Sequence, residues 1–483
     1  MFKIVAYGLM FLLCLIVTAK VRSPRLRTTF LLLVSYALYL TWSSWFFAVL
    51  LLSTLVNYVI GLWLRKRESR FALFAGVLFN LALLGSFKYL PPVAAALPFA
   101  SLHNFSQLVL PLGISFWTFQ AMSYLFDLYR GEELDPTFTE FALFMSFFPV
   151  AISGPICRMP DMLPQFRSQA CTRWNDMAIG LRRIATGTLM MLLGRLLGQG
   201  ILAGDGIASG FDSVKHWSGT DVWILAFGFG LQIFFDFAGY SHVAIGTARM
   251  LGAALPENFA HPFSSTTPSI FWTRWHMSLS FWIRDYVFLP LAVMRRELWW
   301  RNVMLVVAML AFGVWHKASI LFVIWGCYHG VLLLLHRQIQ QLQARLNWYP
   351  QASVWGLLSW LATVSLVSLG WVFFRPNSLA QTREMLSSVL SPATYSSHVL
   401  SGSLYVLVIG LAIAYGLVSL IAEVLDRHAT HCGAEESNSS LITSVADYRW
   451  YWVIPLYAVT LLFVLLITLT QSGGTAQLMY RGF

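Results

Sequence analysis

Long apolar runs separated by short basic clusters dominate the pattern along this chain. The first run covers residues 1–19, and residues 28–64 are long enough for two helices with a break near Trp42. A helix of about 20 mostly apolar residues crosses the hydrocarbon core of a bilayer. The pattern therefore predicts an all-α protein that crosses a membrane many times.

Further apolar runs continue this pattern to the C-terminus. They cover residues 71–89, 108–129, 187–202, 222–251, 302–314, 319–335, 355–374, 404–425 and 450–469. Prolines and glycines interrupt another run, at residues 141–156, and broken backbone at membrane depth is tolerated where it is buried or lines a cavity. At roughly 20 residues per span, we expect about 11–13 membrane helices in one membrane-embedded domain over residues 1–483.

Composition supports a membrane protein and excludes a nucleic-acid-binding one. The chain is 58% hydrophobic and only 11% charged, whereas a soluble protein carries roughly 25% charged residues. Its net charge of +11 is concentrated between the apolar runs, at Lys20–Arg27, Arg65–Arg70 and Arg295–Arg301. Such clusters are typical of cytoplasmic loops under the positive-inside rule. We likewise expect the polar stretch 158–183 to be a cytoplasmic loop with amphipathic pieces.

Several enzyme classes lack their residues in this sequence. The five cysteines are scattered and form no CxxC pair, so neither a disulfide framework nor a metal site is expected. The sequence also has no GxSxG motif and no phosphate-binding GxxxxGK[ST] loop, which hydrolases and ATPases of those types need.

One apolar stretch, residues 271–291, holds an unusual number of ionisable groups. They are Arg274, His276, Arg284 and Asp285. Such groups are costly at membrane depth unless they contact protein or a water-filled cavity. Read as one helix, the stretch places polar residues on one face at spacings of three or four: Thr273, His276, Ser280 and Arg284.

A second stretch, residues 313–330, contains His316 and His329 between apolar runs. Imidazole is the usual general base near neutral pH, so His316 is a candidate to activate an acceptor alcohol. His276 is a candidate to hold that hydroxyl or to stabilise an oxyanion. The alternatives are a hydrogen-bonded packing histidine for His316 and an interfacial one for His276. We expect His329 to be structural, because it lies more than three turns away if both residues share a helix.

Asp236 is an acidic residue within the apolar run 222–251, where its neighbours predict that it is buried. We expect it to pair with Arg249, Arg274 or Arg284, and we favour this structural role over catalysis. Arg284 and Asp285 are also expected to form an ion pair that fixes their helix.

Six blocks of sequence occur together in the order typical of one family. They are residues 110–131, 147–156, 235–252, 257–263, 271–291 and 313–330. On these blocks the chain resembles the membrane-bound O-acyltransferase family, in particular its bacterial branch that serves alginate O-acetylation and teichoic-acid D-alanylation. The resemblance covers most of residues 50–375, which it implies to be the catalytic core, with residues 376–483 as C-terminal spans and tail.

The resemblance implies a many-helix fold around a central funnel, with His316 as the catalytic residue and His276 as a second functional histidine. Trp315, Arg274, Arg284, Asp285 and Asp236 are then expected to shape the site. Lys317 stands where family members usually have glycine. A cation there would disfavour a protonated imidazole if it lies close, or would bind an anionic donor.

The resemblance also implies the reaction and its setting. We expect a bacterial inner-membrane O-acetyltransferase that uses a cytoplasmic thioester, acetyl-CoA or an acyl-carrier protein, with no bound cofactor and no metal. The acyl group would cross the membrane and reach a cell-surface or exported polysaccharide, through an extracytoplasmic acetyltransferase partner. Two alternatives remain: a transporter or flippase of a polysaccharide precursor, which the lack of matching halves disfavours, and a non-catalytic scaffold for an acetyltransferase.

Overall fold

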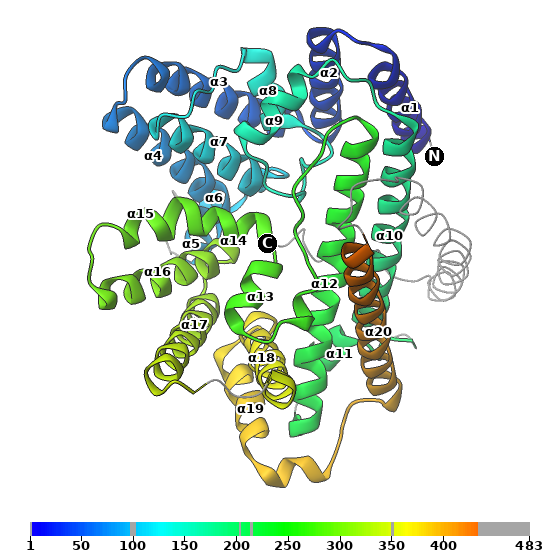
Figure 1. The fold of residues 1–483 in the computed structure, drawn as a ribbon, viewed down its shortest axis with the longest axis vertical. Helices are drawn as coiled ribbons and strands as arrows, with labels where there is room; N and C mark the ends of the chain where they lie inside the picture. Colours follow the sequence, from blue (N-terminus) through cyan, green and yellow to red (C-terminus); the bar gives the residue numbers. More distant parts are fainter. Residues whose placement is uncertain (1, 97–102, 202–203, 213–215, 349–351, 433–483) are drawn as a thin grey trace. The chain divides into compact units, whose positions relative to one another are not determined.

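The computed structural model describes residues 2–96, 103–201, 204–212, 216–348 and 352–432 (Figure 1). Within these residues the secondary structure is helical, without a strand, as the sequence predicts. The chain divides into two compact units. Unit 1 comprises Met1–Ile184, Tyr240–Asn258 and Ser278–Pro290, and unit 2 comprises Ala185–Gly239, Phe259–Met277 and Leu291–Phe483.

The longer helices overlap the predicted apolar runs, except α19, which lies between two of them. They are α1 (Phe2–Lys20), α2 (Pro24–Trp42), α3 (Ser44–Lys66), α4 (Arg70–Lys88), α7 (Ile114–Tyr129), α10 (Trp174–Gln199), α12 (Gly219–Met250), α16 (Leu298–His316), α17 (Ile320–Leu346), α18 (Ala352–Phe374), α19 (Leu379–Leu390) and α20 (Gly402–Cys432).

Shorter helices connect them. They are α5 (Leu90–Ala96), α6 (His103–Ser106), α8 (Phe138–Ser146), α9 (Met159–Arg167), α11 (Ile207–Asp212), the 3-10 helix η2 (Pro262–Ser264), α13 (Pro268–Arg274), α14 (Met277–Ile283), the π-helix η3 (Arg284–Phe288), α15 (Leu289–Ala292) and the 3-10 helix η4 (Pro392–Ser396).

Eight helices in the described part of the chain are long and apolar enough to cross a membrane: α3, α4, α10, α12, α16, α17, α18 and α20. The protein is therefore a multi-pass membrane protein. The predicted span at residues 450–469 lies outside the described residues, so the figure of about 11–13 spans stays a prediction. The central funnel and the division into a core and C-terminal spans also stay predictions.

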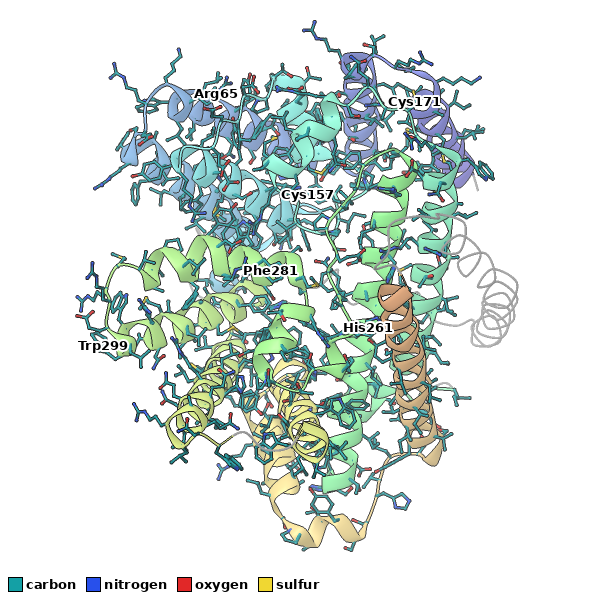
Figure 2. All side chains as sticks on the ribbon, viewed as in Figure 1. Arg65, Cys157, Cys171, His261, Phe281 and Trp299 are labelled. Atoms are coloured by element: carbon teal, nitrogen blue, oxygen red, sulfur yellow. The ribbon has the colours of Figure 1, made fainter. Side chains whose placement is uncertain are left out.

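The predicted break between the first spans occurs at Ser43. Its backbone N–H donates to the Tyr39 carbonyl and closes α2, while its hydroxyl accepts from the Phe46 N–H and opens α3. One serine thus serves as cap for both helices, which is a common role for a short polar side chain. Arg65 lies in the last turn of α3 (Figure 2), where a cation suits the helix dipole.

Helix α7 is the buried element of unit 1 and is shorter than the predicted span over residues 108–129. It begins after Gly113, whose φ of 76° places it in the left-handed region that glycine adopts readily. It packs against α3 and α4. Gly61 on α3 and Gly76 on α4 lie directly against Tyr124 and Leu125, where a larger residue would collide.

Helix α9 is one of the amphipathic pieces predicted within residues 158–183, which also contain the first turns of α10. Four apolar side chains of α9 are buried: Met159, Met162, Leu163 and Phe166. Their spacing is that of one helix face. Burial of this face explains why a segment of low mean hydropathy is helical.

Candidate active site

Residues 271–291 do not form the single helix that the sequence predicts, because the chain breaks at His276. Helix α13 ends before it, α14 starts after it, and η3 follows. His276 itself has a φ of 42°. A left-handed conformation costs a non-glycine residue about 1–3 kcal/mol and is often found at functional sites. Thr273, Ser280 and Arg284 therefore do not share a helix face with His276.

The His276 side chain is buried among aromatic rings of unit 2, with 1% of its surface exposed. Its ring centroid lies 4.5 Å from that of Phe237, 6.3 Å from Trp315 and 6.5 Å from Phe312. Neither ring nitrogen has a hydrogen-bond partner within the described ranges. Buried polar atoms are normally paired, so the imidazole has unused capacity for a ligand or a water molecule.

His316 ends α16 and is also buried, at 6% exposure. Its ring centroid lies 4.6 Å from Trp315 and 5.4 Å from Phe312. On its other sides it meets Phe374 at 5.1 Å and Trp325 at 5.7 Å. His276 and His316 thus contact the same two aromatic residues, Phe312 and Trp315. Both histidines that the sequence singles out belong to one aromatic cluster.

A tight helical hairpin positions His316. A short turn after His316 leads from α16 into α17, with the Ser319 N–H donating to the Lys317 carbonyl over 2.8 Å. Gly313 and Gly326 let the two helices approach, since a side-chain carbon on either would collide with backbone of the facing helix. This close approach brings the apolar rings of α17 against the end of α16.

His329 lies on α17 and not on the helix of His316, so the expected separation of three turns on one helix is wrong. Its ring lies 4.8 Å from Trp325 and 5.2 Å from Trp272. Neither of its ring nitrogens has a hydrogen-bond partner in the described part of the chain. Through Trp325, His329 joins the cluster that holds His316.

Two further predicted site residues of unit 2 are Lys317 and Arg274. Lys317 caps the end of α16 with its backbone, and its side chain is exposed. Arg274 donates a hydrogen bond to the Ser264 hydroxyl over 2.8 Å. Neither interaction involves a catalytic candidate, so any role of these cations toward a donor or acceptor stays a prediction.

Arg284 and Asp285 form the expected ion pair, at 2.6 Å, within unit 1. Asp285 also pairs with Arg158 at 2.7 Å, and the Asp285 carbonyl accepts from Arg130 over 2.7 Å. Both of these arginines lie over the ring of Tyr286, whose hydroxyl donates to Asp127. The ion pair is thus part of a network that ties η3 to α7 and to the start of α9.

Among the described residues, Asp236 forms no ion pair with the three arginines predicted for it. Arg249 pairs with Asp176, Arg274 bonds Ser264 and Arg284 pairs with Asp285. The Asp236 carboxylate lies on α12 directly against Gly194 of α10, where a side chain on residue 194 would collide with it. Each arginine has another partner, and a glycine leaves the space that Asp236 occupies.

Sequence reasoning missed the rings that connect the histidines. Phe312 precedes His316 by one helical turn, and spacing of four residues puts two side chains on one helix face. That spacing could have identified Phe312. No local signal indicates Trp272 or Trp325, because their proximity to the histidines arises only from packing between helices.

The cluster is suited to proton transfer. An imidazole can accept a proton from an alcohol and later return it to a leaving group. Surrounding aromatic rings keep competing water away from the reacting atoms. Among the residues that the structure describes, no group of three or more histidine, cysteine or acidic side chains could hold a metal ion.

Comparison with known proteins identifies the family. The family model described as MBOAT, membrane-bound O-acyltransferase family, matches residues 32–371. The chain is 33% identical over 392 residues to "Probable alginate O-acetylase AlgI" of Pseudomonas aeruginosa, covering 77% of this chain and 71% of that protein. It is 31% identical over 412 residues to "Peptidoglycan O-acetyltransferase" of Helicobacter pylori, covering 78% and 76%.

A third relative has a different name. The chain is 28% identical over 326 residues to "Teichoic acid D-alanyltransferase" of Bacillus subtilis, covering 64% of this chain and 79% of that protein. The matched region of the family model includes both histidine-containing stretches. The chain therefore belongs to the membrane-bound O-acyltransferase family.

Proposed function

We propose that this O-acyltransferase moves an acetyl group from a cytoplasmic thioester to a hydroxyl group. The transfer serves O-acetylation of a cell-surface or exported polysaccharide. The hydroxyl oxygen attacks the thioester carbonyl carbon, the carbon–sulfur bond breaks, and the proton passes to the departing thiolate. The products are an acetyl ester and a free thiol. This balance needs neither an oxidant nor a metal ion.

His316 is the proposed general base. It takes the proton from the attacking hydroxyl and returns it to the sulfur. His276 is proposed to position the hydroxyl or to donate to the oxyanion that forms on the carbonyl oxygen. The observation that carries this assignment is the burial of both imidazoles against the same pair of rings, Phe312 and Trp315.

The donor, the acceptor and the location are part of the proposal. Two of the relatives are named for O-acetylation of alginate or peptidoglycan, which supports an acetyl group and a bacterial inner membrane. The donor is acetyl-CoA or an acetylated carrier protein. An extracytoplasmic acetyltransferase is the proposed partner that completes the transfer to the polysaccharide.

The test is acyl transfer with a labelled donor. Purified protein in nanodiscs receives acetyl-CoA labelled in the acetyl group, with small-alcohol and oligosaccharide acceptors, alone and together with the partner acetyltransferase. Wild-type protein should transfer label, and the His316→Ala variant should lose about 100-fold or more of the rate, as expected when a general base is removed. Undiminished transfer by that variant, at equal protein in the membrane, would overturn the assignment.

Two further assays separate the alternatives: flipping of a precursor in closed liposomes, and surface acetylation in cells. A flippase would move a polysaccharide precursor across the bilayer without any thioester donor. A non-catalytic scaffold would support surface acetylation even when His276 and His316 are both replaced by alanine. Donor-dependent transfer that is lost in the double variant supports the enzyme over both.

A further inference from the structure

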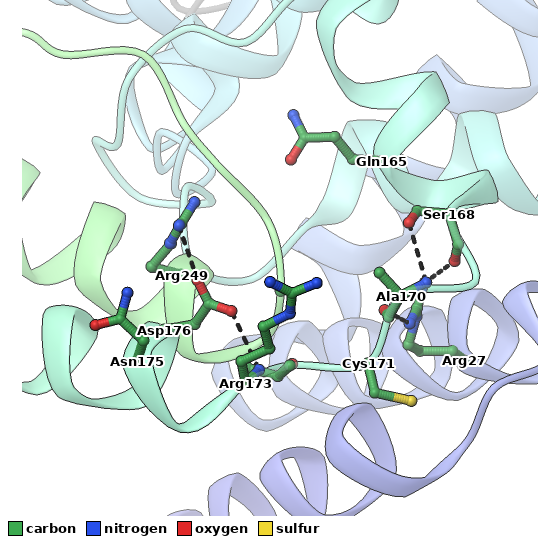
Figure 3. Close-up of a pocket in the computed structure, with 11 residues that line it drawn as sticks. Arg27, Gln165, Ser168, Ala170, Cys171, Arg173, Asn175, Asp176 and Arg249 are labelled. Atoms are coloured by element: carbon green, nitrogen blue, oxygen red, sulfur yellow. Dashed lines mark hydrogen bonds and ion pairs between the residues drawn. The ribbon is translucent and has the colours of Figure 1, made fainter. Parts of the chain in front are cut away.

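A basic cavity of about 330 Å³ lies within unit 1 (Figure 3). It is lined by α2, the end of α9, the start of α10 and the end of α12. Three of its lining residues are arginines, Arg27, Arg173 and Arg249, and the one acidic lining residue is Asp176. The volume is within the range of small-ligand pockets, roughly 300–1,000 Å³. Its excess positive charge favours an anion.

The three arginines differ in the hydrogen bonds and ion pairs that their guanidinium groups already make. Arg27 is buried and donates to the carbonyls of Ser168 and Ala170, so it holds the loop that forms one wall. Arg249 pairs with Asp176 at 2.8 Å. No hydrogen bond or ion pair within the described residues engages the guanidinium of Arg173, which Figure 3 shows extending into the open middle of the cavity.

Two further donors in the lining are buried and have no partner in the described part of the chain. They are the Arg249 Nε and the Thr172 hydroxyl. A native structure rarely leaves buried polar atoms unpaired, and such atoms call for an explanation. Both atoms are closed to solvent as well as unpaired within the described residues, so a ligand in the cavity reaches the exposed side chains of Arg173 and Arg249 rather than these two atoms. A phosphate group suits guanidinium donors that converge from different elements.

We propose that this cavity binds a phosphate group through the guanidinium groups of Arg173 and Arg249. The basic clusters along the chain predict a cytoplasmic position for it, since Arg27 ends the Lys20–Arg27 cluster. A phosphate there has two possible sources: the headgroup of an anionic membrane lipid, or a phosphate of the thioester donor. Only the second source rests on the proposed function.

The cavity contains its own reporter, Cys171, which lines it and is half-buried (Figure 2). The full-length protein is placed in nanodiscs of phosphatidylcholine alone, and the rate of Cys171 alkylation by N-ethylmaleimide is followed by peptide mass spectrometry. Desulfo-coenzyme A supplies phosphates without a reactive thiol, adenosine is the phosphate-free control, and nanodiscs with phosphatidylglycerol test the lipid. Alkylation of Cys327, which is outside the cavity, serves as internal control.

The probe that protects Cys171 from alkylation identifies the source of the phosphate. A probe present at about ten times its Kd should slow Cys171 alkylation about eleven-fold and leave Cys327 unchanged. Protection by desulfo-coenzyme A but not adenosine assigns the donor phosphate, and protection only with phosphatidylglycerol assigns the lipid. No protection by either phosphate source overturns the proposal.

Matched variants distinguish a specific phosphate site from non-specific attraction of an anion to positive charge. Arg173→Gln should raise the Kd of the probe about ten-fold or more, as loss of a charge-assisted hydrogen bond does. At the same probe concentration, protection should then fall from about eleven-fold to about two-fold or less. Arg25→Gln removes the same charge from α2 without touching the cavity, and it should leave protection unchanged. Equal loss in both variants, or no loss in Arg173→Gln, overturns the proposal. Protection measured in the His316→Ala variant keeps this result independent of acyl transfer.

Discussion

His276 and His316 pack against the same two aromatic residues, Phe312 and Trp315, although a break between helices positions one and the end of a helix positions the other. This arrangement gives each histidine a fixed ring orientation from packing. A site held by packing on helices is precise enough for proton transfer. Variants of this cluster can separate the residues that take part in the chemistry from those that only hold the structure.

The strained backbone of His276 permits a test of its side chain alone. Glycine accepts a φ of 42° without the strain that histidine bears. His276→Gly should therefore destabilise the protein by less than the roughly 3–5 kcal/mol expected for emptying a buried aromatic site, because relief of strain offsets part of the loss of packing. Acyl transfer should fall about 100-fold or more. The measurements are thermal unfolding in detergent and labelled acetyl transfer.

A control variant separates strain from chemistry further. His276→Asn keeps a residue type that tolerates the left-handed region and retains a hydrogen-bond donor and acceptor. It should recover part of the activity that glycine loses if His276 positions a hydroxyl. Full activity of the glycine variant would show that His276 contributes only its backbone conformation.

His329 should be dispensable for chemistry. It packs against Trp325 and Trp272 with no hydrogen bond from its ring in the described residues. His329→Phe preserves an aromatic ring of similar shape and should keep transfer within about three-fold of wild type, whereas His316→Phe should lose about 100-fold or more. Comparing the two initial rates decides it, and a large loss in His329→Phe would move His329 into the catalytic group.

The close approach of α16 and α17 should depend on glycine. A methyl group on Gly313 would collide with the Phe322 carbonyl oxygen, and the helices would have to move apart. Gly313→Ala should destabilise the protein by about 1–3 kcal/mol, as overpacking does, and should reduce transfer by displacing His316. Gly410→Ala is the matched control, since its methyl group would meet nothing within 4 Å. Equal unfolding temperatures for both variants would contradict the prediction.

The sequence predicts the helical fold well because span length and capping are local properties. Ser43 is an example: a serine between apolar runs is a cap by its own chemistry, and the structure breaks there. The break at His276 has no such signal. No proline or glycine lies beside His276, so its left-handed backbone is imposed by packing and not by local preference.

The candidate site is predictable only in part for the same reason. The histidines are visible in the sequence as rare polar residues in apolar stretches. Their arrangement is not, because it depends on how closely α16 and α17 approach. If one helix carried both residues, His329 would lie more than three turns from His316. The hairpin of α16 and α17 instead brings both rings to Trp325. Asp236 shows the opposite case, since other partners occupy the arginines expected for it.

The Arg158–Asp285 pair should be coupled energetically. Its atoms lie 2.7 Å apart, both side chains are largely buried, and the pair joins segments that are remote in the sequence. A double-mutant cycle with Arg158→Gln and Asp285→Asn should give a coupling energy of about 0.5–3 kcal/mol, the usual range for contacting residues. Chemical or thermal unfolding of the four proteins measures it, and additive effects would contradict the prediction.

Arg167 should make stability depend on pH in the acid range. It pairs with Asp135 at 2.7 Å and with Glu140 at 2.9 Å, next to the cap of α8. Its hydrogen bond lowers the pKa of Asp135 below 3.8. Burial alone would raise the pKa of Glu140, but bonds from Arg167 and Thr137 outweigh it and lower that pKa below 4.5.

A carboxylate with a lowered pKa stabilises the fold above its ordinary pKa, and this contribution is lost as pH falls through the lowered value. The unfolding temperature should therefore fall as pH drops below about 4.5, as protons bind the unfolded chain first. Arg167→Gln should flatten this slope and cost little near neutral pH, because exposed ion pairs contribute only about 0.2–1 kcal/mol each. Thermal unfolding between pH 3 and 7 measures the slope. The Arg25→Gln variant, which leaves both of these ion pairs intact, should keep the wild-type slope. An Arg167→Gln slope as steep as wild type would show that other carboxylates govern the acid range.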